Sequence, residues 1–155
     1  MRISMTTLSL AALLLAATVA LPLAGRAADD PAVLVKKRIE AMKENGRNLN
    51  MIVAVVRGKK PFDQTAVAAA KASWDYSKTV LSLFPPGSVA PESRAMPEIW
   101  SKPAEFKQAI EQLEAASHKL YEITMTGDVA AMQAQLKEVG AACSNCHDKF
   151  RKPNE

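Results

Sequence analysis

Four stretches of this 155-residue chain repeat apolar side chains at the period of an α-helix, and none reads as a convincing β-strand. The pattern predicts helices over residues 30–57, 63–83, 104–126 and 128–152. Short connections join the first helix to the second and the third to the fourth, so each pair is expected to be antiparallel. The sequence therefore predicts an all-α fold, an antiparallel four-helix bundle.

Residues that favour helix ends support these boundaries. Asp29 or Asp30 is suited to cap the first helix, and Gly127 and Asp128 are suited to end the third and cap the fourth. The one long connection, residues 85–103, holds five of the nine prolines. Its length exceeds that of most loops, so it either has a function or only crosses the bundle.

The N-terminal segment is typical of a secretory signal peptide. Arg2 precedes an almost uncharged apolar run over residues 8–23, and small residues follow it. The alternative is a membrane anchor, but the run is shorter than the about 20 apolar residues of a membrane span, and Pro22 interrupts it. We expect residues 1–27 to be removed, which leaves residues 28–155 as one domain, soluble in the periplasm.

The charge balance argues against nucleic acid as a partner. The formal net charge is +4, and loss of Arg2 and Arg26 with the signal peptide, which holds no acidic residue, lowers it to +2. Aromatic residues make up 5% of the chain, so it lacks the stacking surface that proteins use to bind single strands.

The only two cysteines lie near the end of the last predicted helix, in Cys143-Ser-Asn-Cys146-His147. A Cys-x-x-Cys-His motif marks the covalent attachment of a c-type haem. Thiols at positions i and i+3 of a helix lie about 5–6 Å apart on one face, so both can reach one edge of a porphyrin. The following histidine can bind the iron as an axial ligand. The sequence therefore predicts one covalently attached haem c near the C-terminal end of the last helix.

A structural zinc site and a thiol redox pair are the alternatives for this motif. Zinc needs about four Cys or His ligands, and the chain offers only one further candidate, His118, about 29 residues upstream. A thioredoxin-type pair lies near a βαβ pattern, and no strand is predicted. A disulfide between residues three apart closes too short a loop to stabilise the fold much.

Met42 and Arg38 lie one turn apart on the first predicted helix and share a face. Met42 belongs to the apolar stripe of this helix, so its sulfur is either a gap-filling core group or an iron ligand opposite His147. Arg38 is either a solvated helix residue or the partner of a haem propionate. Met96, in the long connection, is the rival iron ligand, because Met51 is expected on a solvated face.

An exported four-helix bundle with Cys-x-x-Cys-His so close to its C-terminus resembles the class II c-type cytochromes, the cytochrome c-prime and cytochrome c-556 family. The resemblance extends over the whole mature chain, and one segment, Met42-Lys-Glu-Asn-Gly-Arg47, is similar to the c-556 type in particular. The other segments that carry it are Arg38-Ile-Glu-Ala-Met42, Gly58-Lys-Lys-Pro-Phe62, Pro97-Glu-Ile-Trp100 and Cys143-Ser-Asn-Cys-His-Asp-Lys-Phe-Arg151.

The resemblance implies residue roles and a function. It implies that Met42 is the second axial ligand, that Arg38 contacts a haem propionate, and that Arg151 lies close to His147 on the proximal side. Low-spin His/Met iron suits an electron carrier that serves redox partner proteins, with no enzyme activity. The alternative is a five-coordinate, high-spin cytochrome c-prime that binds nitric oxide or carbon monoxide. Relatives of the c-prime type are often homodimers, so a homodimer is a further expectation.

Overall fold

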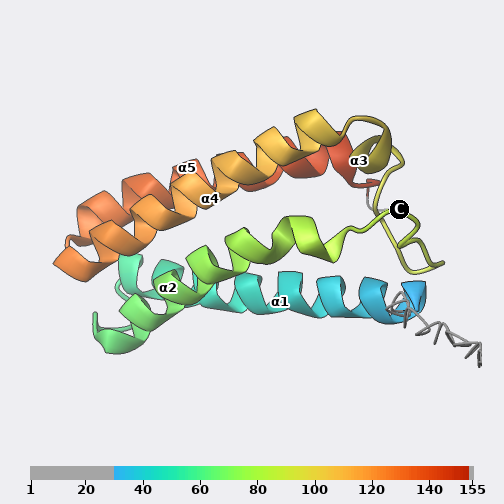
Figure 1. Cartoon of the computed structure of the whole chain (residues 1–155). Coiled ribbons are helices and arrows are strands. Elements are labelled where there is room, and N and C mark those ends of the chain that lie inside the picture. The colour runs from blue at the N-terminus through green and yellow to red at the C-terminus, as the bar shows by residue number, and fades with distance from the viewer. Residues whose placement is uncertain (1–29, 154–155) are drawn as a thin grey trace, which may run out of the picture.

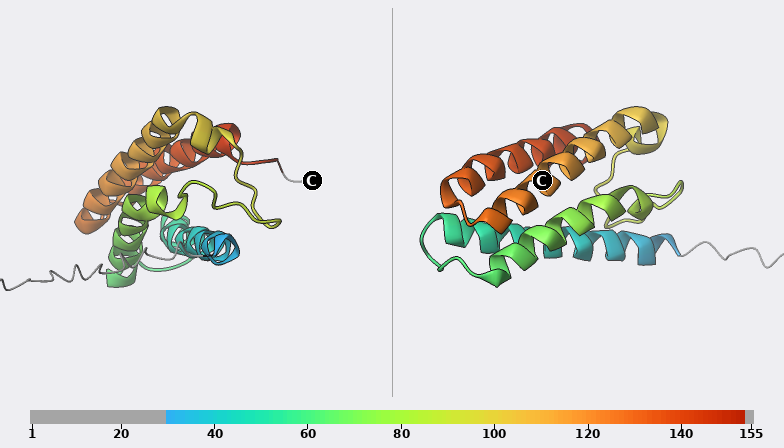
Figure 2. Two further views of the ribbon diagram at one scale, coloured as in Figure 1. Left: turned by 45° about the vertical axis from the view of Figure 1, so that its right-hand side comes forward. Right: turned by 60° about the vertical axis from the view of Figure 1, so that its left-hand side comes forward.

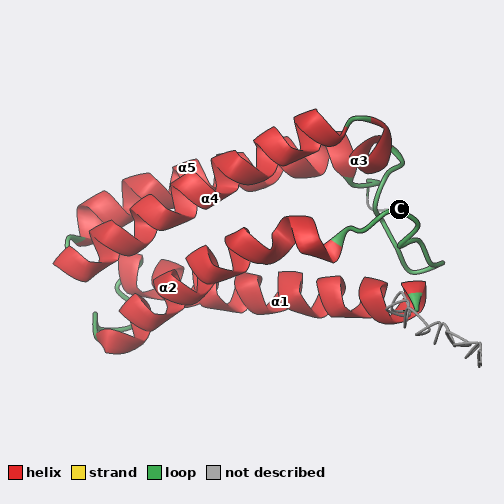
Figure 3. Cartoon of the chain, viewed as in Figure 1, coloured by secondary structure: helices red, strands yellow, loops and turns green. Residues whose placement is uncertain are grey.

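The computed structural model describes residues 30–153, and its regular elements are helices (Figures 1 and 3). The long helices are α1 (Pro31–Val56), α2 (Gln64–Thr79), α4 (Pro103–Thr126) and α5 (Val129–Phe150). A short 3-10 helix, η1 (Val80–Leu83), continues α2, and α3 (Glu98–Ser101) lies in the long connection. Within residues 30–153 no strand forms beyond one isolated backbone bridge, so the all-α prediction is confirmed.

The four long helices form two antiparallel hairpins that stack on each other (Figures 1 and 2). One hairpin consists of α1 and α2, and the other of α4 and α5. Neighbouring helices touch in the order α1, α2, α4, α5 and back to α1. This ring of contacts confirms the predicted four-helix bundle.

The turns at one end of the bundle show how local sequence sets its geometry. Asp128 caps α5, since its carboxylate accepts a hydrogen bond from the Ala131 N–H at 2.9 Å. Gly127 ends α4 with a φ of 74°, a left-handed conformation that favours glycine. A Cβ on Gly127 would lie 3.3 Å from the Phe62 ring, so the turn between α1 and α2 packs closely against this one. The predicted roles of Gly127 and Asp128 are confirmed.

The core runs along the centre of the bundle, and it buries a wider part of the α1 surface than the single apolar stripe expected from the sequence. Met51 is partly buried and packs against the core, so the prediction that it lies on a solvated face is wrong. The reason is that α2 and α5 both contact α1, which covers a wider arc of that helix. The largest fully buried apolar side chains are Val35, Ile52, Val80, Leu120, Met132 and Val139.

The predicted signal peptide, residues 1–27, lies outside the described residues. Among the helices formed by residues 30–153, none is long and apolar enough to cross a membrane.

Candidate haem site

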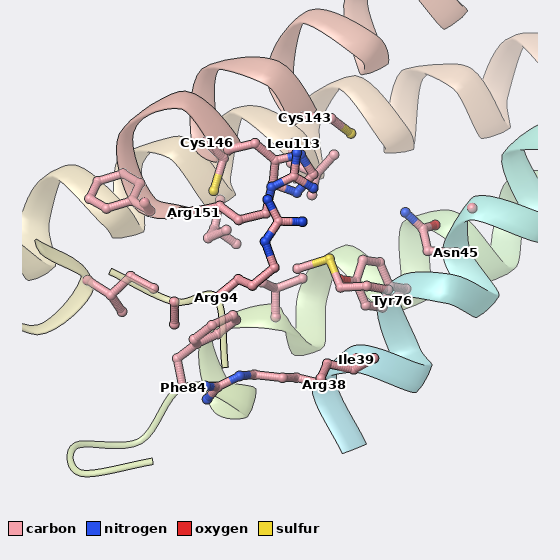
Figure 4. Close-up of a pocket in the computed structure, with 18 of the residues that line it drawn as sticks. Arg38, Ile39, Asn45, Tyr76, Phe84, Arg94, Leu113, Cys143, Cys146 and Arg151 are labelled. Carbon is pink, nitrogen blue, oxygen red and sulfur yellow. The ribbon is translucent and has the colours of Figure 1, made fainter. Parts of the chain in front are cut away.

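A cavity of about 540 Å³ lies at the end of the bundle where α1 and α4 begin and α2 and α5 end (Figure 4). All four long helices contribute to its wall, and residues of the long connection close one side. Its volume is typical of a site for a small molecule or cofactor. Much of the lining is apolar, with Val80, Ile99, Phe106, Ile110 and Leu113 among the buried side chains.

Helix α5 places the whole Cys-x-x-Cys-His motif in this wall. Cys143, Cys146 and His147 all line the cavity from the last two turns of α5. Burial raises the pKa of the Cys143 thiol, and burial together with the neighbouring Cys143 raises the pKa of Cys146 to about 11. Thiol redox pairs depend on a lowered pKa, so this environment argues against the redox alternative.

His147 is half-buried and lies near two arginines. Burial lowers the pKa of its imidazole, and the positive charges of Arg151 and Arg94 lower it further. Arg151 and Arg94 line the cavity together with His147, and their side chains lie beside each other in Figure 4. The site therefore favours neutral imidazole, which is the form that binds a metal.

The long connection is fastened across the C-terminal end of α5. The Met96 N–H donates to the Phe150 carbonyl at 2.9 Å, and the Lys152 N–H donates to the Arg94 carbonyl at 2.8 Å. Between these bonds, residues 95 and 151 form the antiparallel bridge. The connection thereby adds Arg94 to the cavity wall, whereas Met96, the rival ligand, is not part of it. Sequence reasoning missed Arg94, because no local pattern marks such a long-range contact.

Helix α1 forms the wall that contains Met42. The Met42 side chain is half-buried and lines the cavity. Gly46, one turn later, lines it too, and a Cβ built on Gly46 would meet no atom within 4 Å. The absent side chain therefore leaves open space on this wall, as a bulky planar group would require.

Arg38 is the most deeply buried cation at the site, with 4% of its surface exposed. Its guanidinium donates to the Ser88 hydroxyl at 3.0 Å and the Ser93 hydroxyl at 2.5 Å, and it lies 4.7 Å from the centre of the Phe84 ring (Figure 4). Burial lowers the pKa of Arg38. No acidic side chain of residues 30–153 forms an ion pair with it. Since a buried charge without a counter-ion is costly, a carboxylate on a bound ligand would complete this site.

Two further polar groups in the cavity wall lack partners. Asn45 Oδ1 in α1 and the Tyr76 hydroxyl in α2 are buried and make no hydrogen bond in the described structure. Neither residue was singled out from the sequence. The available signal was the position of Asn45, three residues after Met42 and so on the same face of the helix.

Taken with the motif, these features fit a haem. The two thiols share one helix face, the walls are apolar, Gly46 leaves space, and Arg38 lacks the negative charge that a propionate would bring. The zinc alternative finds no support, because residues 30–153 contain no group of three or more side chains able to hold a metal ion. His118 instead stacks on Trp74, with ring centres 4.2 Å apart.

Comparisons with known proteins agree with this assignment. Residues 33–151 match the family model described as Cytochrome C'. Cytochrome c-556 of Rhodopseudomonas palustris is 34% identical over 128 residues, which cover 76% of this chain and 82% of that protein.

Solved structures show the same architecture. The crystal structure of cytochrome c' from Rubrivivax gelatinosus has a TM-score of 0.73 and 33% identity, covering 80% of this chain and 98% of that one. The nitric oxide complex of a mutant cytochrome c prime from Alcaligenes xylosoxidans has a TM-score of 0.75 and 30% identity, covering 82% and 99%. With a family match over nearly all described residues and relatives of the same fold, this chain belongs to the cytochrome c' family and carries one covalently attached c-type haem.

Proposed function

We propose that this chain is an electron carrier whose haem is attached through Cys143 and Cys146 and whose iron is bound by His147 and Met42. The observation that carries the proposal is that Met42 of α1 and His147 of α5 line the same cavity from different helices. The bound haem supplies the redox-active iron. An iron with both axial positions filled needs little rearrangement on electron transfer, and a methionine ligand raises the reduction potential.

Two arginines complete the proposed site. Arg38 pairs with a haem propionate, which supplies the negative charge that its buried position lacks, in a charge-assisted hydrogen bond. Arg151 lies on the proximal side, where its charge adds to burial in lowering the pKa of His147. The imidazole is thereby kept available to the iron.

A second function is the binding of nitric oxide or carbon monoxide at five-coordinate, high-spin iron. The comparisons favour this function over the His/Met carrier, because similar solved structures are of cytochrome c', and several of them have nitric oxide or carbon monoxide bound. In this case Met42 is only part of the cavity wall. Both functions use the same haem attachment, and they differ in the role of Met42.

Replacement of Met42 by alanine distinguishes the two functions. If its sulfur binds the iron, the ferric wild-type protein is low-spin, and Met42→Ala converts it to high-spin iron that binds carbon monoxide rapidly when reduced. Met96→Ala is the control, since Met96 is half-buried but outside the cavity wall. A wild-type protein that is already high-spin, with no change in Met42→Ala, would establish the gas-binding function instead.

The proposed place of action is the periplasm, after removal of residues 1–27. The charged start and the apolar run of the N-terminal segment support this step. The mass of the exported protein should equal that of residues 28–155 plus one haem, and a full-length species in the membrane fraction would contradict cleavage. Light scattering of the mature protein then shows whether it is a monomer or the homodimer that the resemblance implies.

A further inference from the structure

The wall of the haem cavity contains two polar side chains that are needed neither to attach the haem nor to bind its iron. Asn45 in α1 is 7% exposed, and its Oδ1 has no hydrogen-bond partner. The hydroxyl of Tyr76 in α2 is also buried without a partner. Both residues line the cavity, and both are visible in its wall in Figure 4. Because an unpaired buried polar group is costly, each of them is expected to find a partner in the haem-loaded protein.

The position of Asn45 indicates what that partner is. Asn45 follows Met42 by three residues, so their Cβ atoms are neighbours on one helix face, about 5–6 Å apart. Lys43 and Glu44, which lie between them in the sequence, are exposed. Asn45 is therefore buried because it lies on the face of α1 that points into the bundle, and not because the whole of this turn is buried. Met42 and Asn45 both line the cavity, so the Asn45 amide lies on the same wall of the site as the Met42 side chain.

The orientation of this amide depends on a second group. The oxygen and nitrogen of an asparagine side chain exchange places when the amide turns over, so a neighbouring donor or acceptor selects between the two orientations. Burial raises the pKa of the Tyr76 phenol, so its hydroxyl remains protonated and available as a donor. A hydroxyl that donates to Oδ1 would leave the amide N–H groups directed to the iron ligand.

We propose that Asn45 is a positioning residue whose side-chain N–H donates a hydrogen bond to the atom bound at the sixth position of the haem iron. In the haem-loaded protein Tyr76 holds the amide in this orientation by donating to Asn45 Oδ1, a bond that pairs the two atoms left without partners in the described structure. In the native protein the bound atom is the Met42 sulfur, so this inference rests on the proposed electron-carrier function. A hydrogen bond to the sulfur withdraws electron density from ferric iron, and it therefore favours the ferrous state and raises the reduction potential.

The first test is the reduction potential of the haem-loaded Asn45→Leu protein, because leucine keeps the volume and removes the amide. Loss of one hydrogen bond should lower the ferrous-to-ferric ratio at a fixed applied potential by up to about tenfold. For the transfer of one electron, this corresponds to a fall in the reduction potential of up to about 59 mV. Tyr76→Phe removes only the hydroxyl and should lower the potential in the same direction by less. Asn50→Leu, on the exposed side of α1, should leave the potential unchanged.

The second test does not depend on Met42 as a ligand. In the Met42→Ala background, carbon monoxide occupies the sixth position of the reduced iron, and an N–H donor lowers its C–O stretching frequency. Asn45→Leu should raise that frequency, and Tyr76→Phe should raise it less. If neither the frequency nor the potential moves in either variant, the inference is overturned. Failure of the electron-carrier proposal is recognised separately, by the spin state of the wild-type protein.

Discussion

Nη1 of Arg38 lies 3.0 Å from the hydroxyl oxygen of Ser88, and this hydrogen bond ties the long connection after η1 to helix α1. The other terminal nitrogen donates to Ser93 at 2.5 Å, and the Phe84 ring lies against the guanidinium. A single buried side chain therefore contacts the connection at two points, Ser88 and Ser93, and also the Phe84 ring directly before it. The same connection contributes Arg94 to the haem cavity, so the shape of the site depends on Arg38.

Replacement of Arg38 by leucine should lower the free energy of unfolding of the haem-loaded protein by about 2–3 kcal/mol. The reason is the loss of two buried hydrogen bonds from a charged donor. The free energy of unfolding of Arg38→Lys should lie between those of Arg38→Leu and the wild type, since lysine keeps the positive charge but lacks the planar guanidinium that bonds to two acceptors at once. Guanidinium chloride denaturation measures the change. Lys37→Ala, at an exposed neighbouring position, is the control and should be near neutral.

Replacement of both Cys143 and Cys146 by alanine should abolish covalent attachment, whereas each single variant should keep one thioether bond. The two sulfurs lie on one face of α5 and line the cavity, so each can attach independently. Acid–acetone extraction followed by mass measurement separates free from attached haem. Ser144→Ala, between the two cysteines and exposed, should retain haem fully. Haem that leaves the wild-type protein on extraction would contradict attachment at this motif.

The four long helices and several of their ends could be predicted because their signals are local, although α2 ends at Thr79, directly before the 3-10 helix η1, and α5 ends at Phe150. The third predicted helix, residues 104–126, ends at the same residue as α4 and begins one residue later, and the glycine and aspartate after it have the expected roles. Such signals depend on residues within a turn of one another. The same locality made the Cys-x-x-Cys-His motif recognisable without any knowledge of the fold.

The polar half of the site could not be predicted from these patterns. Apolar periodicity places Met42 in the core stripe, but it assigns Arg38 and Asn45 no buried role, although both are more than nine-tenths buried. Their burial depends on a cavity that α1 shares with three other helices and the long connection. For Met51 the periodicity predicted an exposed side chain, but the side chain is partly buried, because both α2 and α5 contact α1 and cover more of its surface.

The carboxylate of Asp63 should give the fold a measurable pH dependence. It accepts hydrogen bonds from the Thr65 hydroxyl at 2.5 Å and the Thr65 N–H at 2.8 Å, and these hold the pKa of Asp63 below its ordinary value of about 3.9. A depressed pKa means that the ionised form stabilises the folded state above about pH 4, and that this contribution is lost as the pH falls through the folded value.

The test compares wild type with Asp63→Asn, which keeps a capping oxygen but does not titrate. The difference in urea midpoint should be constant at pH values well above the ordinary pKa of about 3.9 and should shrink as the pH falls through the lowered pKa of the folded protein. A difference that stays the same over this whole range would show that the charge of Asp63 does not contribute.

Gly46 offers a test of where the haem lies, because a matched glycine exists elsewhere in the bundle. A Cβ would meet no atom within 4 Å at either Gly46 in α1 or Gly140 in α5, but only Gly46 lines the cavity. Alanine is favoured over glycine inside a helix by about 1 kcal/mol. Gly140→Ala should therefore raise the free energy of unfolding of the haem-loaded protein by about this amount.

At Gly46 the outcome should differ, since the space that is open beside its Cα is the space that the porphyrin ring takes. Gly46→Ala should raise the free energy of unfolding by less than Gly140→Ala does. Gly46→Leu should lower the haem content and shift the haem absorption bands, because the larger side chain competes with the ring for space. Haem content per chain and the absorption spectrum, measured on the three variants, separate the effect of helix propensity from this competition. Normal haem content and an unchanged spectrum in Gly46→Leu would mean that the ring does not lie against α1, and ligation by Met42 would then lose its geometric basis.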